Sequence, residues 1–236
     1  SEMSNFAGTD KRVLFFGRAK CAATEELLSK FFRYGFDVTF VKSHKRGEKL
    51  PEDIYLWEGE YIVCFRSLFI LPKRLIEKAN IAAINFHPAP PEYPGSGCIN
   101  FALYDEVSEY GVTAHVMNEL VDNGKILEVR RFPVTRFDNL ASVLSRTHRE
   151  LLNLCSDFIS GLHSNGENFL NEKLVTSENE IWRGNARLLN ELDALQKIDI
   201  NVTERELKRI IRATYIDGYP PKIELHGFSF RLEIDE

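Results

Sequence analysis

Three polar side chains near the middle of the sequence have the chemistry that acyl transfer needs. Asn85 and His87 are two residues apart in an apolar run, and Asp122 opens a short turn sequence that ends in glycine. A carboxylate beside a histidine holds the ring in one tautomer and stabilises an imidazolium. A neutral amide nearby suits the oxyanion of a tetrahedral intermediate. No serine or cysteine nucleophile is expected beside His87, so the pattern favours direct transfer; from spacing alone, the alternative is a structural histidine at a strand end.

The segments that must position these residues alternate between strand and helix. Short apolar runs predict buried strands at residues 12–17, 37–41, 61–65 and 81–87. Helical patterns separate them, and the alternation predicts right-handed βαβ units in an α/β, Rossmann-like open sheet, mainly parallel and flanked by helices. Asn85 and His87 end the fourth strand, on the edge where open sheets bind ligands, and a period of two puts both on one side.

The rest of the chain divides into two parts. Residues 89–97 hold three prolines and two glycines, which predicts a preorganised loop beside the site. Two more strands and a long amphipathic helix follow and complete a catalytic domain at residues 1–165. We expect residues 166–236 to form an extension with a small helix that begins after Thr203 and a terminal β-hairpin at Lys222–Ile234.

Composition narrows the class of protein. The net charge of −5 and the pI near 5.8 argue against a nucleic-acid partner. The polar first ten residues lack a signal-peptide pattern, and no apolar run reaches membrane-spanning length. Four scattered cysteines and six unclustered histidines indicate a reducing, cytoplasmic setting and no metal site. His115 either supports the proposed site or only packs beside it.

Several spaced motifs resemble one known family. They are Asn85-Phe-His87 with Pro88, Pro91-x-Tyr93-x-Gly95, Gly111-Val-Thr-Ala-His115 and Asp122-x-Gly124-x-Ile126. In this order they resemble the formyltetrahydrofolate-dependent formyltransferases, which include methionyl-tRNA and glycinamide ribonucleotide formyltransferases. The resemblance implies N10-formyltetrahydrofolate as co-substrate, no metal, and Asn85, His87 and Asp122 as the catalytic group. It also implies that the co-substrate is bound by Arg66, Ser67, Leu68, Pro90 and Gly95.

The loop after His87 resembles that of bacterial sugar N-formyltransferases. This implies transfer to the amine of a nucleotide-linked amino sugar, of the dTDP-4-amino-4,6-dideoxyhexose type, for a surface polysaccharide such as O-antigen. The resemblance also implies that Tyr93 lies on the substrate side. Because the terminal hairpin is too small to be stable alone, we expect it to pack against a second copy of the chain in a homodimer. Trp182 and Arg183 could contact a nucleotide and Arg212 a phosphate, with packing between the two parts as the alternative. A purine-type formyltransferase, a folate-linked hydrolase and a noncatalytic sugar-nucleotide-binding relative remain the other candidates.

Overall fold

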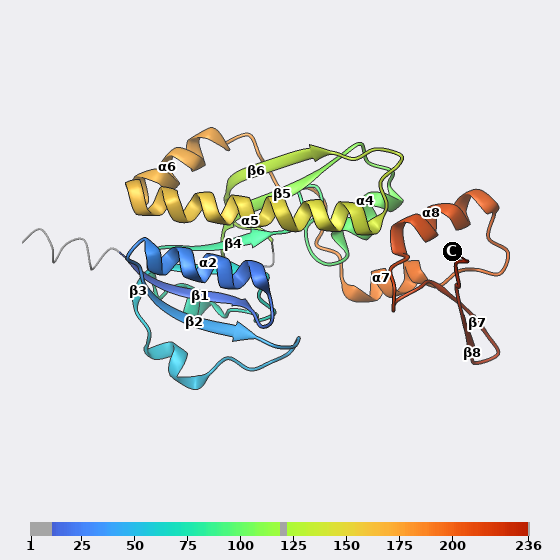
Figure 1. The fold of residues 1–236 in the computed structure, drawn as a ribbon, viewed down its shortest axis with the longest axis horizontal. Coiled ribbons are helices and arrows are strands. Elements are labelled where there is room, and N and C mark those ends of the chain that lie inside the picture. The colour runs from blue at the N-terminus through green and yellow to red at the C-terminus, as the bar shows by residue number, and fades with distance from the viewer. Residues whose placement is uncertain (1–10, 119–121, 236) are drawn as a thin grey trace, which may run out of the picture.

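The core of the protein is a six-stranded, mainly parallel sheet in the order β2-β1-β3-β4-β5-β6 (Figure 1). This computed structural model describes residues 11–118 and 122–235, so the polar start of the chain lies outside the described residues. The strands are β1 (Arg12–Arg18), β2 (Asp37–Ser43), β3 (Gly59–Phe65), β4 (Ala79–His87), β5 (Glu109–Val116) and β6 (Ile126–Pro133). The first four are parallel, while β5 pairs antiparallel with both β4 and β6. The predicted fold class is confirmed.

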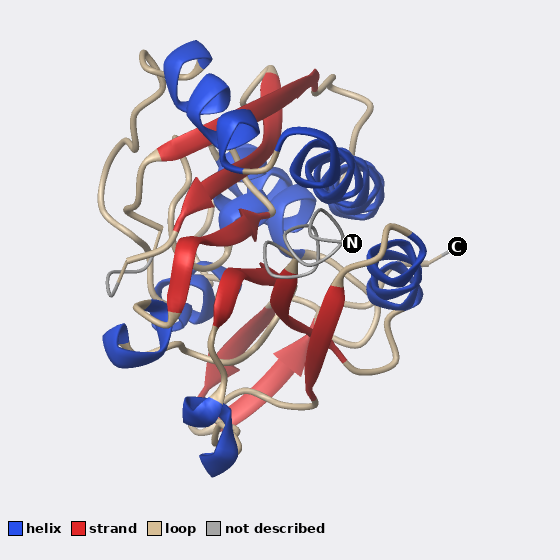
Figure 2. Cartoon of the chain, turned by 90° about the vertical axis from the view of Figure 1, so that its left-hand side faces the viewer, coloured by secondary structure: helices blue, strands red, loops and turns tan. Residues whose placement is uncertain are grey.

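Alternating side chains of the strands fill separate cores on the two faces of the sheet. Val13 and Phe15 of β1 pack on one face, which is covered by α2 (Ala22–Arg33), α5 (Leu140–Asn165) and α6 (Glu167–Thr176). Leu14 and Phe16 pack on the other face, with η1 (Glu52–Leu56) and α3 (Lys73–Ile76). Figure 2 shows α2 and α5 along their axes, on one side of the twisted sheet. Two covered faces explain why the strand sequences are apolar almost throughout.

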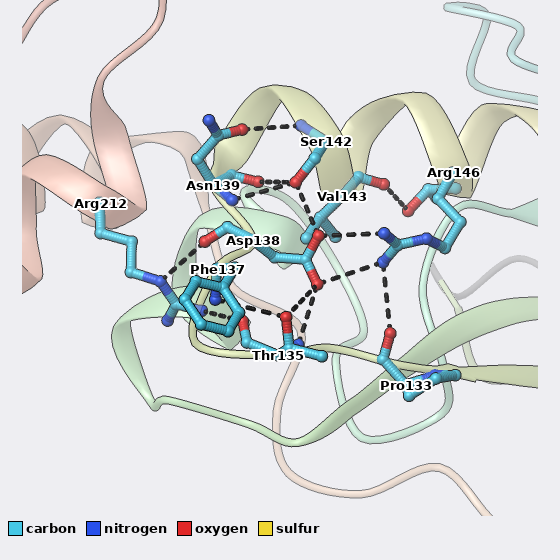
Figure 3. A network of polar contacts seen from close by, with 10 residues as sticks. Pro133, Thr135, Phe137, Asp138, Asn139, Ser142, Val143, Arg146 and Arg212 are labelled. Atoms are coloured by element: carbon cyan, nitrogen blue, oxygen red, sulfur yellow. Dashed lines mark hydrogen bonds and ion pairs between the residues drawn. The ribbon is translucent and has the colours of Figure 1, made fainter.

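The start of α5 is held by a polar network around Asp138 (Figure 3). The Asp138 carboxylate accepts hydrogen bonds from the Thr135 amide, the Ser142 hydroxyl and the Arg146 guanidinium. Asn139 caps the helix, and its side chain accepts from the Ser142 amide. The guanidinium bonds of Arg146 lower the pKa of Asp138 to about 2. The network fixes the turn between β6 and α5.

The C-terminal elements lie together at one end of the molecule (Figure 1). They are α7 (Leu189–Gln196), α8 (Glu204–Thr214), β7 (Lys222–Leu225) and β8 (Phe228–Arg231). The predicted hairpin and the helix after Thr203 are confirmed, and Thr203 caps α8 by accepting from the Glu206 amide. His226 and Gly227 both have positive φ, as a tight two-residue hairpin turn requires. Ala213 of α8 packs in a third core with α4 (Cys98–Tyr104).

Some elements differ from the sequence-based expectations. Between β3 and β4, where the sequence indicates a helical pattern, the structure has only the four residues of α3, with Pro72 at its N-cap. Helix α6 starts just after the expected boundary at residue 165, but its Leu170 belongs to the same core as β1 and α5. Within residues 11–118 and 122–235, no helix is long and apolar enough to cross a membrane.

Candidate active site

Antiparallel pairing of β4 with β5 brings Asn85 and His115 face to face. The register sets Asn85 opposite His115 and His87 opposite Thr113. The amide Nδ2 of Asn85 lies 3.2 Å from Nε2 of His115. On the other ring nitrogen, His115 Nδ1 lies 3.0 Å from the Val116 carbonyl, which can only accept. His115, left open from the sequence, therefore lies inside the site with its ring orientation fixed.

Asp122 joins the two histidines. Its Oδ1 lies 3.4 Å from His87 Nδ1 and 3.5 Å from His115 Nε2, while its Oδ2 accepts from the Gly95 amide at 2.8 Å. The Asp122 side chain is only 7 % exposed, and His87 is 4 % exposed. The structure thus brings Asn85, His87 and Asp122 together in a buried, water-poor setting, where electrostatic interactions are strong.

Both ring nitrogens of His87 face hydrogen-bond acceptors. Nδ1 faces the Asp122 carboxylate, and Nε2 lies 2.9 Å from the Tyr93 carbonyl. Burial, the largest influence, lowers the pKa of His87, but the negative charge of Asp122, the neighbouring Cys98 and the hydrogen bond to the Tyr93 carbonyl together outweigh it and raise the pKa to about 9. Burial likewise favours a protonated Asp122, yet the charge of His87 and the hydrogen bonds from His115 and the Gly95 amide together bring the carboxyl pKa below its usual value. The pair is therefore an imidazolium and a carboxylate at neutral pH.

A cysteine that sequence reasoning missed also lies beside His87. Cys98 Sγ is 3.8 Å from His87 Nε2, although no cysteine was expected there. The left-handed Gly97 turns the chain into α4 and so returns Cys98 to the histidine, a reversal that residue spacing does not reveal. The thiol lies 3.1 Å from the Tyr93 carbonyl and 3.2 Å from the Gly95 carbonyl, to which it can donate. With its proton directed at carbonyls, Cys98 is placed as a packed thiol, and direct transfer stays the favoured chemistry.

The proline-rich loop is bonded to a segment from the C-terminal part of the chain, residues 180–188. Gly95 forms a bridge with Arg187, and the Ser96 amide donates to the Arg187 carbonyl at 2.9 Å. The Arg183 amide donates to the Pro91 carbonyl at 3.0 Å. Gly95 has φ +88°, and a Cβ there would lie 2.4 Å from the Arg187 nitrogen. Only glycine fits this close approach.

Of the residues expected to bind the sugar nucleotide, Trp182 lies at the catalytic group. Its ring centroid is 5.8 Å from that of His87 and 5.0 Å from that of His115. Arg183 is exposed beside it. The Tyr93 hydroxyl donates to Asp105 at 2.7 Å, so its hydroxyl points toward α4.

The Arg212 side chain contacts the β6–α5 turn and α4. Its guanidinium donates to the carbonyls of Asp138 and Thr135 (Figure 3) and to that of Leu103. These bonds join α8 to the β6–α5 turn and to α4. Within the described residues, these hydrogen bonds go to backbone carbonyls and not to Asn85, His87 or Asp122. These hydrogen bonds agree with the packing alternative noted from the sequence, while phosphate binding by Arg212 stays a prediction.

The residues expected to bind the co-substrate lie in two places along the sheet edge. Gly95 and the buried Pro90 belong to the loop beside His87, and the Pro90 carbonyl accepts from the Tyr93 amide. Arg66, Ser67 and Leu68 follow β3, the strand next to β4, and the Leu68 amide donates to the Ser43 hydroxyl at 3.0 Å.

A cluster of cationic groups surrounds Arg66. Its carbonyl accepts from Arg18 Nε at 3.0 Å, and its guanidinium donates to the Cys21 sulfur at 3.4 Å. Burial lowers the pKa of His148 on α5 to about 4, aided by the charges of Arg66 and Arg18. Burial and the charge of Arg66 also lower the pKa of Arg18. Positive charge therefore gathers at the carboxyl ends of β1 and β3, and an anionic group would relieve its self-repulsion. In the part of the chain that the structure describes, no group of three or more His, Cys, Asp or Glu side chains could hold a metal ion.

Comparisons with known proteins agree with this geometry. A family model described as "Formyl transferase" matches residues 15–159. Methionyl-tRNA formyltransferases from Listeria welshimeri and Ehrlichia ruminantium (strain Welgevonden) are 30 % and 29 % identical to this chain, over 74 % and 84 % of its length. In each case the match covers 62 % of the relative, so the chain spans about three-fifths of those proteins.

Solved structures of similar fold match over nearly the whole chain. A sugar N-formyltransferase from Shewanella sp. has a TM-score of 0.72 at 19 % identity, with 95 % of this chain and 97 % of that one covered. A 4-N formyltransferase from Francisella tularensis has a TM-score of 0.68 at 19 % identity, with 97 % and 100 % covered. A Helicobacter canadensis N-formyltransferase, solved with folinic acid and dTDP-3-aminofucose, has a TM-score of 0.66 at 15 % identity, with 91 % and 84 % covered. Because the family match takes in more than half of the sequence, including Asn85, His87 and Asp122, this chain belongs to the formyl transferase family.

Proposed function

We propose that this protein transfers a formyl group from N10-formyltetrahydrofolate to the amine of a nucleotide-linked amino sugar. The observation that carries the proposal is the buried contact of His87 with Asp122, with Asn85 next to it in the same site. A sugar acceptor is supported by the fold match with the Shewanella sugar N-formyltransferase, which covers almost all of both chains.

The reaction needs a proton donor near the formyl oxygen and a neutral amine. The amine nitrogen attacks the formyl carbon, the carbonyl oxygen becomes an oxyanion, and the intermediate collapses as the bond from carbon to N10 breaks. His87 gives its proton to N10 as that bond breaks and then takes up the proton that leaves the amine nitrogen, so the transfer balances and His87 regains its charge. Charged His87 suits stabilisation of the oxyanion and protonation of N10, with the Asn85 amide as a second donor.

The charge on His87 decides between two routes for the amine. The amine either arrives neutral or arrives charged and is deprotonated by His87. An imidazolium cannot accept that proton, so the amine arrives neutral. The Nε2 proton of His87 is directed at the Tyr93 carbonyl in the ligand-free protein, and the formyl oxygen takes the place of that carbonyl during the reaction.

The identity of the sugar is the finer part of the proposal. We favour a dTDP-linked 4-amino-4,6-dideoxyhexose destined for a bacterial surface polysaccharide, made in the cytoplasm. A 3-amino isomer is the main competitor, because the Helicobacter relative was solved with dTDP-3-aminofucose. The cation cluster around Arg66 and Arg18 supports an anionic ligand at the sheet edge, either the diphosphate of the sugar nucleotide or the glutamate tail of the folate.

A panel of acceptors tests the proposal. We would measure kcat/KM with N10-formyltetrahydrofolate for dTDP- and GDP-linked 3-amino and 4-amino sugars, with initiator methionyl-tRNA, glycinamide ribonucleotide and water as further arms. A site that positions one amine should favour its isomer by on the order of 10²-fold. Equal rates across the sugars, or faster transfer to the tRNA or to glycinamide ribonucleotide, would contradict a sugar acceptor.

A further inference from the structure

Residues 180–188 lie beyond the family-matched range of 15–159, yet they contact the catalytic group. Backbone hydrogen bonds join this segment to the proline-rich loop at Pro91, Pro94 and Ser96. Arg131 of β6 adds two ion pairs, one at 2.7 Å to Glu180 of the segment and one at 2.8 Å to Glu92 of the loop. Backbone hydrogen bonds and ion pairs therefore hold residues 180–188 against the proline-rich loop along the length of their contact.

Trp182 is the residue through which this segment reaches the catalytic group. Its indole Nε1 donates to the Gly124 carbonyl at 2.7 Å, in the turn that carries Asp122. Its ring meets His87 at an interplanar angle of 64° and His115 at 89°. One side chain thus touches both histidines and the turn of the aspartate.

The close packing around Gly124 links the hydrogen bond from Trp182 to the end of β5. A Cβ at Gly124 would lie 1.5 Å from the Val116 carbonyl oxygen, so the turn lies directly on the end of β5. The carbonyl of that turn points to the indole, while the Val116 carbonyl also faces His115 Nδ1. Displacement of the indole would therefore remove the hydrogen bond to the Gly124 turn and one packing contact from each of the His87 and His115 rings.

We propose that Trp182 is a positioning residue that fixes His87, His115 and the Asp122 turn, so that the segment beyond the matched domain completes the active site. This inference rests on the proposed function for its kinetic consequences. It differs from the sequence-based interpretation, in which Trp182 stacks on the nucleotide. A stacking residue would change the affinity for the sugar nucleotide, whereas a positioning residue changes the rate of the chemical step.

The kinetic test compares three variants of the full chain. W182L removes the ring and the N–H, W182F keeps a ring, and I181A alters an exposed neighbour in the same segment. We expect W182L to lower kcat by on the order of 10²-fold with KM for both substrates within about twofold of wild type, because misplacing reacting groups by about an ångström has that effect. W182F should recover a large part of the rate, and I181A should match wild type.

A second measurement needs no substrate. Proton NMR should show hydrogen-bonded imidazole N–H signals for His87 in the ligand-free wild type and in W182F, because buried N–H groups exchange slowly with water. In W182L these signals should broaden or disappear, while thermal unfolding shows that the chain is still folded. If W182L does not fold, kcat and the imidazole signals of W182F are compared with those of I181A, and this comparison tests whether Trp182 positions the histidines.

The possible outcomes distinguish a positioning role of Trp182 from stacking on the nucleotide. A rise in KM for the sugar nucleotide at unchanged kcat would show a stacking residue and overturn the inference. Unchanged kinetics together with unchanged imidazole signals in W182L would also overturn it. If the wild type transfers formyl to none of the acceptors, the proposed function fails, and the NMR signals alone then decide whether Trp182 positions the histidines.

Discussion

At the scale of single residues, the pairing of His87 with Asp122 determines which proton chemistry is possible. In D122N the carboxylate charge is lost, so the pKa of His87 should fall from about 9 by about 1–3 units, because burial then dominates. Turnover should drop by on the order of 10²-fold. NMR titration of the imidazole and steady-state kinetics measure the two effects, with D193N on the exposed surface of α7 as control. An unchanged His87 titration would contradict the ion pair.

The same pair makes stability depend on pH. The pKa of His87 is raised above its usual 6.5, so its stabilising contribution is complete below about pH 6.5 and is lost as the pH rises through about 9. Asp122 has a lowered pKa, so its contribution is present above its usual 3.8 and is lost on acidification through the folded value. The free energy of unfolding should therefore fall between pH 6.5 and 9.5, by up to about 3 kcal/mol from His87.

Denaturant titrations at pH 6.5 and 9.5 measure this loss. The variant H87Q keeps a polar side chain but does not titrate in this range, so its unfolding free energy should differ much less between the two pH values. An equally large fall in H87Q would assign the pH dependence to other groups.

At the scale of elements, the contact of the proline-rich loop with residues 180–188 depends on Gly95. In G95A the new Cβ would clash with the Arg187 backbone, and the residue would be strained at φ +88°. We expect a loss of about 1–3 kcal/mol in stability and a lower kcat, since the Gly95 amide also donates to Asp122. G184A is a matched control, because Gly184 has φ +67° but nothing within 4 Å of an added Cβ. Equal effects of the two changes would show that backbone strain, not the clash, is responsible.

The cation cluster at the carboxyl ends of β1 and β3 is expected to bind an anionic group of one substrate. R18Q removes one charge that lies next to Arg66, and we expect KM to rise by about tenfold for whichever substrate places its anionic group there. Separate KM values for the sugar nucleotide and for mono- and polyglutamylated folate identify that substrate. R33Q, an exposed change in the last turn of α2, is the control. No change in either KM would remove the cluster from the binding site.

Much of the element order could be predicted from the sequence, because many elements have clear local patterns. The four parallel strands are apolar runs bounded by polar residues, and the hairpin has its turn at His226-Gly227. Helices α6 and α7 were not predicted, and α7 has no buried residue in the described structure that would mark it by an apolar stripe.

The site was predictable in part for similar reasons. Asn85 and His87 follow from strand period, and Asp122 follows from the family motif. The places of Cys98 and Trp182 depend on contacts between distant segments, at Gly97 and at Gly124, which a local pattern does not contain.

At the scale of the whole molecule, the terminal hairpin exposes apolar rings. Phe228 is 71 % exposed and Phe230 is 57 % exposed, both on β8. An isolated two-stranded hairpin is marginally stable, so we expect it to pack against a second copy in a twofold dimer. Light scattering should give twice the chain mass for wild type and the chain mass for F228S/F230S, with S229A as control. A monomeric wild type at working concentration would contradict the dimer.

The bridge from Gly95 to Arg187 has a consequence for the order of events in folding. The two residues are roughly ninety positions apart in the sequence, and closing so long a loop is slow compared with the pairing of neighbouring strands. The strands and helices around β1 to β4 can form from nearer contacts, before residues 180–188 reach the loop. Refolding chains would then pass through a state with a complete sheet and an open, inactive site, and recovery of the catalytic geometry would mark the last step.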